Sequence, residues 1–343
     1  MNRKYRSRVI AVLGSGSWGV TLARLFADNG HDVRLWCFLP EEYEMLREGR
    51  ERRDVLPGLV LPAAVEISDD AVAVADGADL VFFVVPSFGI RATAELVKPA
   101  CDGSQILVSA AKGLEEDTHL RMTEVLEEVA GGCARGLIAF SGPSHAEEVA
   151  RGIPTSIVAA GAQESLAEEV AAAARGPSLR VYTNDDTVGV EYGAALKNVI
   201  AIAAGVADGL GFGDNTKAAL LTRGLAEISR LGVARGANPL TFAGLSGLGD
   251  LVVTCMSAHS RNRYVGEELG RGRPLDDILK SMKMVAEGVR TTKVAYALAA
   301  ESGVEMPITA EMYRVMFEGK EPRAAVADLM ARPPRSEASA AAR

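Results

Sequence analysis

A G-x-G-x-x-G pattern at residues 14–19 constrains the fold of this chain more than any other feature. It follows the short apolar run Arg8–Leu13 and opens the segment Trp18–Asn29, whose apolar residues recur at helical spacing. Strand, glycine loop and helix in this order are the context in which the pattern binds a dinucleotide. The three glycines permit the tight turn, the approach of backbone to a pyrophosphate and close helix–strand packing, in that order. The N-terminus of the helix then offers N–H groups and a favourable dipole to phosphate. We therefore expect a dinucleotide-binding domain.

The first half of the chain alternates strand-like and helix-like segments. The apolar, strand-like runs are Arg8–Leu13, Asp32–Trp36, Asp79–Val85, Gln105–Ser109, Leu137–Phe140 and Ser156–Ala160. Stretches with helical spacing separate them. This alternation predicts βαβ units on a mostly parallel sheet that is buried on both faces, as in a doubly wound Rossmann domain.

The pattern changes after about Thr183, where β-branched runs become rare. Long helical segments with glycine breaks follow, namely Thr187–Asp208, Asp214–Leu231, Pro239–Gly244, Asn262–Arg271, Leu275–Met282, Thr291–Ser302 and Pro307–Phe317. We therefore predict a Rossmann domain over residues 1–187 and an all-helical substrate domain over 188–331. The tail 332–343 combines Pro, Ser, Ala and charge without a core pattern, which predicts disorder.

Composition excludes several classes of function. The net charge of −8 argues against a general binder of nucleic acid or of membrane surfaces. Four cysteines without CxxC pairing, in a chain of 343 residues, indicate a reducing compartment, and the four histidines lack metal-ligand spacing, so no metal is expected. The N-terminus shows no signal-peptide pattern. The longest apolar stretch, around Val199–Val206, is short of the roughly 20 residues of a membrane span. We expect a cytoplasmic protein without membrane insertion.

One lysine lies in a strongly apolar segment of the second half. Lys197 is flanked by Ala194–Leu196 and Val199–Ala204, so its helix expects burial around most of its circumference. Lysine is almost never fully buried unless it is paired. An acidic partner or an anionic ligand should therefore compensate Lys197.

Three further segments carry candidate ligand-binding residues. Lys112 follows the strand Gln105–Ser109 at its carboxyl end, where ligands bind in open α/β sheets. Ser141–Ser144 follows the next strand and begins a helix. Ser260–Arg263 combines a candidate N-cap serine, helix N–H groups and a guanidinium, a set that suits a phosphate monoester.

Each of these residues also has a purely structural interpretation. Lys112 and Arg261 are compatible with ordinary surface charges, and Ser144 with a helix N-cap. Likewise, residues 247–250 are compatible with a simple turn before the apolar Leu251–Val253.

The end of the second strand bears on the choice of cofactor. NAD-binding proteins usually place an acid there for the ribose hydroxyls, and NADP-binding proteins use a nearby arginine. Here the strand ends with residues 35–38, Leu-Trp-Cys-Phe, and has neither, because Glu41 and Glu42 come only after Pro40. Both NAD and NADP remain possible. Phe38 either stacks on the adenine or is a hydrophobic residue at the rim.

Seven motifs occur together and in order, and they carry a specific resemblance. They are GSGSWG (14–19), AKGLE (111–115), SGPSHAEE (141–148), ALKNVIAIAAGVADGL (195–210), GLGDLVVTC (247–255), SRNR (260–263) and VAEGVRT (285–291). Over about residues 8–320 the chain resembles the NAD(P)-dependent glycerol-3-phosphate dehydrogenases of the bacterial, phospholipid-precursor type. The resemblance implies a Rossmann domain, a helical domain like that of 6-phosphogluconate dehydrogenase, and interconversion of dihydroxyacetone phosphate and sn-glycerol 3-phosphate with NAD(P)H. We also expect a homodimer.

The resemblance assigns residues position by position. Lys197 falls on the proton acceptor. The implied substrate-binding residues are Lys112, Gly142, Ser144, Lys197, Asp250, Ser260, Arg261 and Asn262. The implied cofactor-binding residues are Ser17, Trp18, Lys112, Ala146, Arg261, Val285 and Glu287, to which the glycine pattern and the second strand add Gly14, Gly16, Gly19 and Phe38. His145 replaces a common Phe, and Phe38 replaces a common basic or histidine side chain, which leaves a preference for NADP open.

The chemistry of ketone reduction fits this placement. A nascent alkoxide needs charge stabilisation and a proton, and an ammonium supplies both. A free lysine titrates near 10.4, so its pKa should fall if it is to exchange protons near neutrality. Lys112 would lower that pKa as a second cation, whereas Asp250 would raise it and orient the ammonium.

Two other functions remain open at this point. One is a dehydrogenase of the same architecture that acts on a β-hydroxy acid or a sugar acid. The other is a nucleotide-sensing protein without catalysis, although Lys197 and Asp250 are both present.

Overall fold

The computed structural model describes residues 7–334 and 336, and these fold into two compact units. The first unit contains the described residues up to Ala111 together with Met122–Thr187. The second contains Lys112–Arg121 and the described residues from Val188 onward. Most of the tail predicted to be disordered lies outside the described residues.

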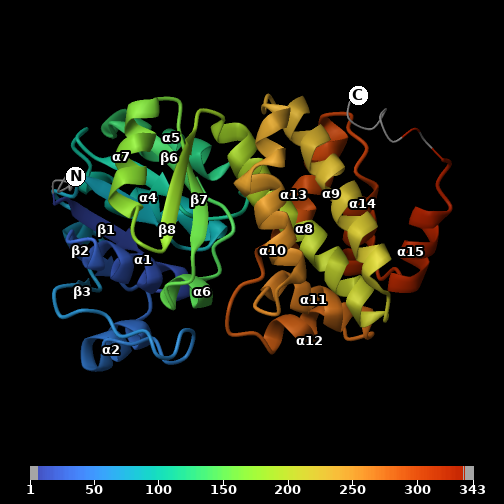
Figure 1. Ribbon diagram of the computed structural model, residues 1–343, viewed down its shortest axis with the longest axis horizontal. Coiled ribbons are helices and arrows are strands. Elements are labelled where there is room, and N and C mark those ends of the chain that lie inside the picture. The colour runs from blue at the N-terminus through green and yellow to red at the C-terminus, as the bar shows by residue number, and fades with distance from the viewer. Residues whose placement is uncertain (1–6, 335, 337–343) are drawn as a thin grey trace. The chain divides into compact units, whose positions relative to one another are not determined.

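The first unit is built on an eight-stranded sheet with the order β3-β2-β1-β4-β5-β6-β7-β8 (Figure 1). Its strands are β1 (Val9–Leu13), β2 (Asp32–Trp36), β3 (Glu66–Ser68), β4 (Leu80–Phe83), β5 (Ile106–Ser109), β6 (Gly136–Ser141), β7 (Thr155–Ala160) and β8 (Leu179–Asn184). The first six strands have the order of a doubly wound dinucleotide-binding sheet. Leu13 of β1 is in register with Trp36 of β2 and Phe83 of β4, so these strands end at one level.

Helices cover the sheet on both faces, and for this reason β4 and β5 are buried at every position. The helices are α1 (Ser17–Asp28), α2 (Pro40–Gly49), α3 (Ala71–Ala75), α4 (Ile90–Val97), α5 (Met122–Ala130), α6 (Ala146–Ala150) and α7 (Glu164–Ala174), with short 3₁₀ turns at Ser87–Gly89, Lys98–Ala100 and Gly131–Cys133. Helix α1 packs against α6 and α7, whereas α4 packs against α3 and α5. The predicted α/β fold class is thus confirmed, with a mostly parallel sheet.

Two features of the sheet differ from the predicted series of strands. Strands β3 and β8 were not predicted; β3 is short and polar, and β8 alternates buried with exposed residues at the edge. In addition, β6 pairs with β7 antiparallel. The connection between them, residues 142–154, carries only the five-residue helix α6 and not a full crossover helix of the kind that usually joins parallel strands.

The second unit is helical in its described part, apart from one isolated bridge between Leu114 and Arg121. Its helices are α8 (Thr187–Gly209), α9 (Asp214–Ala234), α10 (Asp250–Met256), α11 (Arg261–Gly270), α12 (Leu275–Lys280), α13 (Glu287–Glu301), α14 (Pro307–Phe317) and α15 (Pro322–Met330), with a 3₁₀ turn at Pro239–Ala243 and a π-helical turn at Leu245–Gly249. Helices α10 and α15 were not predicted, and α13 begins four residues before its predicted start. The expected all-helical character is confirmed.

Helix α8 forms the centre of the second unit, and its residues from Gly189 to Ala207 are buried. A Cβ at Gly205 would collide with the Arg263 carbonyl oxygen, and one at Gly266 with the Ile202 carbonyl oxygen. Glycine at both positions therefore lets α8 and α11 approach backbone to backbone. This close contact fixes the start of α11 beside the middle of α8.

The burial of α8 corrects one argument made from the sequence. Among the described residues, Thr187–Gly209 is the one helix long and apolar enough to cross a membrane, so the stretch is not too short for a span. Its apolar window is, however, 100% buried inside the protein. Burial in a helical core, and not insufficient length, accounts for its composition.

The segment Lys112–Arg121 leaves β5 and belongs to the second unit. Arg121 forms an ion pair with Glu191 at 2.6 Å, and Glu116 pairs with Lys293 at 2.9 Å. These contacts attach the segment to α8 and α13, which places Lys112 in the helical unit although it follows a strand of the sheet.

Candidate active site

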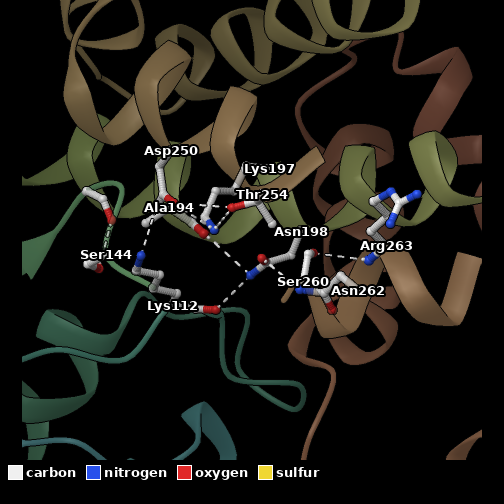
Figure 2. Close-up of polar contacts among 11 residues, drawn as sticks. Lys112, Ser144, Ala194, Lys197, Asn198, Asp250, Thr254, Ser260, Asn262 and Arg263 are labelled. Carbon is white, nitrogen blue, oxygen red and sulfur yellow. Dashed lines mark hydrogen bonds and ion pairs between the residues drawn. The ribbon is translucent and has the colours of Figure 1, made fainter. Parts of the chain in front are cut away.

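Lys197 lies in the buried middle of α8, 4% exposed, and is paired as its burial requires (Figure 2). Its Nζ lies 3.0 Å from Oδ1 of Asp250 and donates to Oγ1 of Thr254 at 2.6 Å. Thr254 in turn donates to Asp250 Oδ1 at 3.2 Å. Asp250 and Thr254 are four residues apart on α10, so both project from one face of that helix. The acidic partner expected for Lys197 is therefore Asp250.

A second ammonium completes this cluster. Nζ of Lys112 donates to the other oxygen of Asp250, Oδ2, at 2.8 Å. One buried carboxylate thus lies between two lysines, with a net charge of +1 for the three groups when all are ionised. The cluster suits an electron-rich oxygen, because it retains an excess of positive charge in a setting of low dielectric.

The surroundings lower the pKa values of both Lys197 and Asp250, but for different reasons. Burial lowers the pKa of Lys197 to about 8; Asp250 opposes that effect, and the charge of Lys112 adds to it. For Asp250 burial acts to raise the pKa, but the two ammonium groups outweigh it and hold the pKa below its usual value. Lys197 is therefore able to exchange protons near neutrality, whereas Asp250 stays ionised.

A chain of side-chain amides connects the cluster to three other segments. Asn198 donates from Nδ2 to the carbonyl oxygen of Lys112 at 3.1 Å and accepts at Oδ1 from Nδ2 of Asn262 at 2.9 Å. Asn262 then accepts at Oδ1 from the backbone N–H of Gly288 at 2.9 Å. The loop that bears Lys112, the first turn of α11 and the start of α13 are thereby held in fixed positions around α8.

The start of α11 has the predicted serine N-cap. Ser260 is its N-cap, and Oγ accepts from the N–H of Arg263 at 3.2 Å. Arg263 is turned away to Asp208, at 2.7 Å. Arg261, by contrast, is exposed in the first turn. Ser260, Arg261 and Asn262 therefore follow one another at a helix N-terminus joined to the lysine cluster through Asn198.

The glycine loop of the first unit is shaped for a dinucleotide. A Cβ at Gly19 would collide with the Gly14 carbonyl oxygen, so the helix packs onto the loop only with glycine there. Gly16 is exposed, and a Cβ on it would meet no atom within 4 Å, which leaves space above the loop. Helix α1, which begins with Ser17 and Trp18, has no acidic residue in its first turn and no side-chain cap. A pyrophosphate fits this cradle of N–H groups.

The other predicted positions of the first unit lie beyond strand ends. Phe38 follows β2, is 70% exposed, and meets Trp36 edge-on at 5.7 Å between ring centroids. Gly142, with φ at +137°, and Ser144 lie in the loop after β6, and Ala146 begins α6. The N-cap of α6 is His145, and Ser144 Oγ donates instead to the Gly142 carbonyl oxygen at 2.9 Å. The N-cap interpretation of Ser144 is therefore wrong.

In the second unit, Glu287 is the first residue of α13 and lies directly before Gly288; Val285 precedes it by two residues.

The sequence analysis did not identify two residues of the candidate site, Thr254 beside Lys197 and Asn198 in the chain of amides. Both were detectable, since Thr254 stands one helical turn after Asp250 and Asn198 is a polar residue inside an apolar helix.

A glycine loop on a doubly wound sheet and a paired, buried lysine in a helical unit are the features of a dinucleotide-dependent oxidoreductase with two domains. Comparison with known proteins specifies the family. Residues 9–167 match the model of the NAD-dependent glycerol-3-phosphate dehydrogenase N-terminus, and residues 186–327 match that of the C-terminus. The chain therefore belongs to the NAD-dependent glycerol-3-phosphate dehydrogenase family.

Individual relatives agree along nearly the whole chain. A glycerol-3-phosphate dehydrogenase [NAD(P)+] of Desulfitobacterium hafniense is 51% identical over 94% of this chain and 91% of its own length. One of Geobacillus kaustophilus is 51% identical over 96% of both chains. The crystal structure of glycerol-3-phosphate dehydrogenase from Coxiella burnetii superposes with a TM-score of 0.91 at 35% identity, and covers 95% of this chain and 99% of that one.

Proposed function

We propose that this glycerol-3-phosphate dehydrogenase reduces dihydroxyacetone phosphate to sn-glycerol 3-phosphate with NADH or NADPH, reversibly, and so supplies glycerophospholipid synthesis. The observation that carries the proposal is the buried Lys197, paired with Asp250 and flanked by Lys112, in a member of this family. The same cluster argues against a sensing protein without catalysis, because a ligand that is only bound needs no proton-exchanging amine.

In the proposed reaction Lys197 is the proton donor. The nicotinamide, when bound, supplies a hydride to the carbonyl carbon of the substrate. The ammonium of Lys197 stabilises the negative charge that develops on the carbonyl oxygen and then donates its proton to that oxygen. Asp250 holds this ammonium in place through its 3.0 Å contact, and Lys112 contributes a second positive charge. In the reverse direction the neutral amine of Lys197 accepts the proton.

Lys197 is predicted to give the two directions opposite pH profiles. Reduction needs the ammonium, so its kcat/KM should fall as pH rises through about 8. Oxidation of glycerol 3-phosphate needs the amine, so its kcat/KM should rise over the same range. Initial rates in both directions, measured across this range at fixed ionic strength, check the prediction. Profiles that fall together would assign the ionisation to another group.

We assign the phosphate of the substrate to the start of α11. The N–H groups of its first turn and the helix dipole favour an anion there. Arg261 adds a guanidinium, and Asn262 adds a side-chain amide. Ser260 shapes this turn as its cap, and Gly142 and Ser144 are proposed as further substrate contacts.

Replacement of Arg261 by Ala should mainly weaken substrate binding. The phosphate is present in both the ground state and the transition state, so KM should rise about 10- to 100-fold, equivalent to one charged hydrogen bond. The value of kcat should stay within a few-fold of wild type. Steady-state kinetics decide the point, and a large loss of kcat at unchanged KM would remove Arg261 from phosphate binding.

The cofactor is assigned to the glycine loop. We propose contacts from Gly14, Gly16, Ser17, Trp18 and Gly19, whose loop and helix start fit a pyrophosphate, and adenine stacking on Phe38. The remaining cofactor positions, Lys112, Ala146, Arg261, Val285 and Glu287, come from the resemblance. The division into a cofactor domain over 1–187 and a substrate domain over 188–331 is part of this proposal, with Lys112 assigned to the helical unit.

A substrate panel tests the proposed function directly. Loss of NADH absorbance should be rapid with dihydroxyacetone phosphate and slow with β-keto acids, unphosphorylated dihydroxyacetone and keto sugar acids. Preference for a carboxylate substrate would favour the alternative dehydrogenase. We further propose that the protein is cytoplasmic and that it forms a homodimer. Sedimentation analysis of the purified chain tests the homodimer.

A further inference from the structure

We propose that Glu42 binds the adenosine ribose of the cofactor and makes the enzyme prefer NADH to NADPH. This inference rests on the proposed function and extends it to a residue of α2, which belongs neither to the glycine loop nor to β2. In the sequence, Glu42 stands too far along to be the acid at the end of the second strand. In the structure, α2 returns it to the glycine loop.

Glu42 is in direct contact with the glycine loop. Its Oε2 accepts from Oγ of Ser15 at 2.5 Å, and its Oε1 lies 3.0 Å from NH1 of Arg52. Arg52 also donates to the carbonyl oxygen of Ser15 at 2.6 Å. The carboxylate is therefore held beside the loop by two partners of fixed position.

This location is also at the end of β2. The N–H of Gly14 donates to the carbonyl oxygen of Trp36 at 3.1 Å, so the loop and the strand end adjoin. Burial raises the pKa of the thiol of Cys37, the next residue, to about 11, while Ser15 and Arg52 act to lower that pKa and Glu42 to raise it. In doubly wound sheets the ribose acid occupies the end of the second strand, beside the pyrophosphate loop. Glu42 supplies from α2 the acid that β2 itself lacks.

The electrostatics of this group oppose a 2′-phosphate. Arg52 is only 3% exposed, and it makes a two-pronged contact with Asp54, with Nε to Oδ1 at 2.9 Å and NH2 to Oδ2 at 2.8 Å. Glu42, Asp54 and Arg52 together carry one net negative charge. The guanidinium is thus buried and engaged with Asp54, Ser15 and Glu42.

The neighbouring arginines are engaged as well. Arg50 donates to the carbonyl oxygens of Leu61, Pro62 and Val65, and Arg53 pairs with Glu51 at 3.0 Å. Glu42, in contrast, keeps a side chain 20% exposed. An ionised carboxylate has about four acceptor sites, so Glu42 retains the capacity to accept hydrogen bonds from ribose hydroxyls. A phosphate ester at the 2′ position would meet its negative charge.

Direct binding measurements test this inference apart from turnover. The dissociation constants of NADH and NADPH are measured by quenching of protein fluorescence, without substrate. We expect wild type to bind NADH at least about tenfold more tightly, and Glu42→Gln to narrow that ratio by about tenfold, equivalent to ~1.4 kcal/mol. Because no ketone is present, a failure of the proposed reaction would leave this result standing.

Glu41→Gln is the matched control, since Glu41 is the exposed neighbour in the same first turn of α2. It removes an equal charge and should leave the ratio unchanged within about twofold. Equal effects of both variants would mean that the preference between NADH and NADPH depends only on overall charge, which would contradict a direct role of Glu42. Tighter binding of NADPH than of NADH by wild type would also overturn the proposal.

Salt dependence provides a test that needs no variant. Screening weakens repulsion, so added salt should improve NADPH binding by wild type relative to NADH. A relative loss of NADPH binding would indicate attraction of the 2′-phosphate and contradict the role of Glu42.

Discussion

Replacement of Lys197 by Met should reduce kcat for dihydroxyacetone phosphate by at least about 10³-fold, while NADH binds as in wild type. The variant loses the proton donor and the charge that stabilises the developing alkoxide, effects worth about 10²–10⁴ and 10²–10³, respectively. Methionine replaces the aliphatic stem of lysine without its ammonium, and Asp250 keeps its 2.8 Å contact with Lys112, so no buried charge is left alone. Steady-state rates and NADH titration, with thermal melting as the check of folding, measure the outcome. Near-normal turnover would remove Lys197 from the mechanism.

Replacement of Asp250 by Asn should have the second-largest effect, a loss of about 10²-fold in kcat/KM. The amide cannot balance two ammonium groups, and removing one partner of a buried ion pair costs about 3–5 kcal/mol, so stability should fall too. Asp250 raises the pKa of Lys197 in wild type. Without Asp250 the pKa of Lys197 should fall below its wild-type value of about 8, and the decline of reduction with rising pH should begin at a lower pH. The full pH–rate profile of the variant measures both changes.

Glu227→Gln is the control for this loss of a buried carboxylate. Glu227 is buried in the same unit, where it accepts from the backbone N–H groups of Ile308 and Thr309 at the start of α14. Burial raises its pKa to about 7, and it belongs to no part of the proposed site. The variant should keep wild-type kcat. If Glu227→Gln lost as much activity as Asp250→Asn, the effect would reflect general destabilisation.

The sequence predicted the main features of the fold because they depend on local patterns. Alternating apolar runs indicated the sheet, and the glycine pattern indicated the loop after β1. The burial of Lys197 followed from its apolar neighbours, and burial required a partner. The strand order and the antiparallel β6–β7 pair were not predictable in this way, since they depend on the path that each connection takes across the sheet and not on a local pattern.

Parts of the candidate site escaped prediction because they depend on contacts between distant segments. Lys112 follows β5, yet its segment folds with the helical unit through ion pairs such as Arg121 with Glu191. Glu42 reaches the glycine loop because Arg52, ten residues later in the chain, is buried against Ser15. Neither contact has a local signal in the sequence.

A crystal structure of the enzyme with dihydroxyacetone phosphate and a non-reducing nicotinamide cofactor tests the central claim most directly. The measurement is the distance between Nζ of Lys197 and the carbonyl oxygen of the substrate. We predict hydrogen-bonding contact, about 2.6–3.2 Å, with Asp250 still paired to the same ammonium. A substrate whose carbonyl oxygen is bound by other groups, with Lys197 turned away from it, would contradict the account.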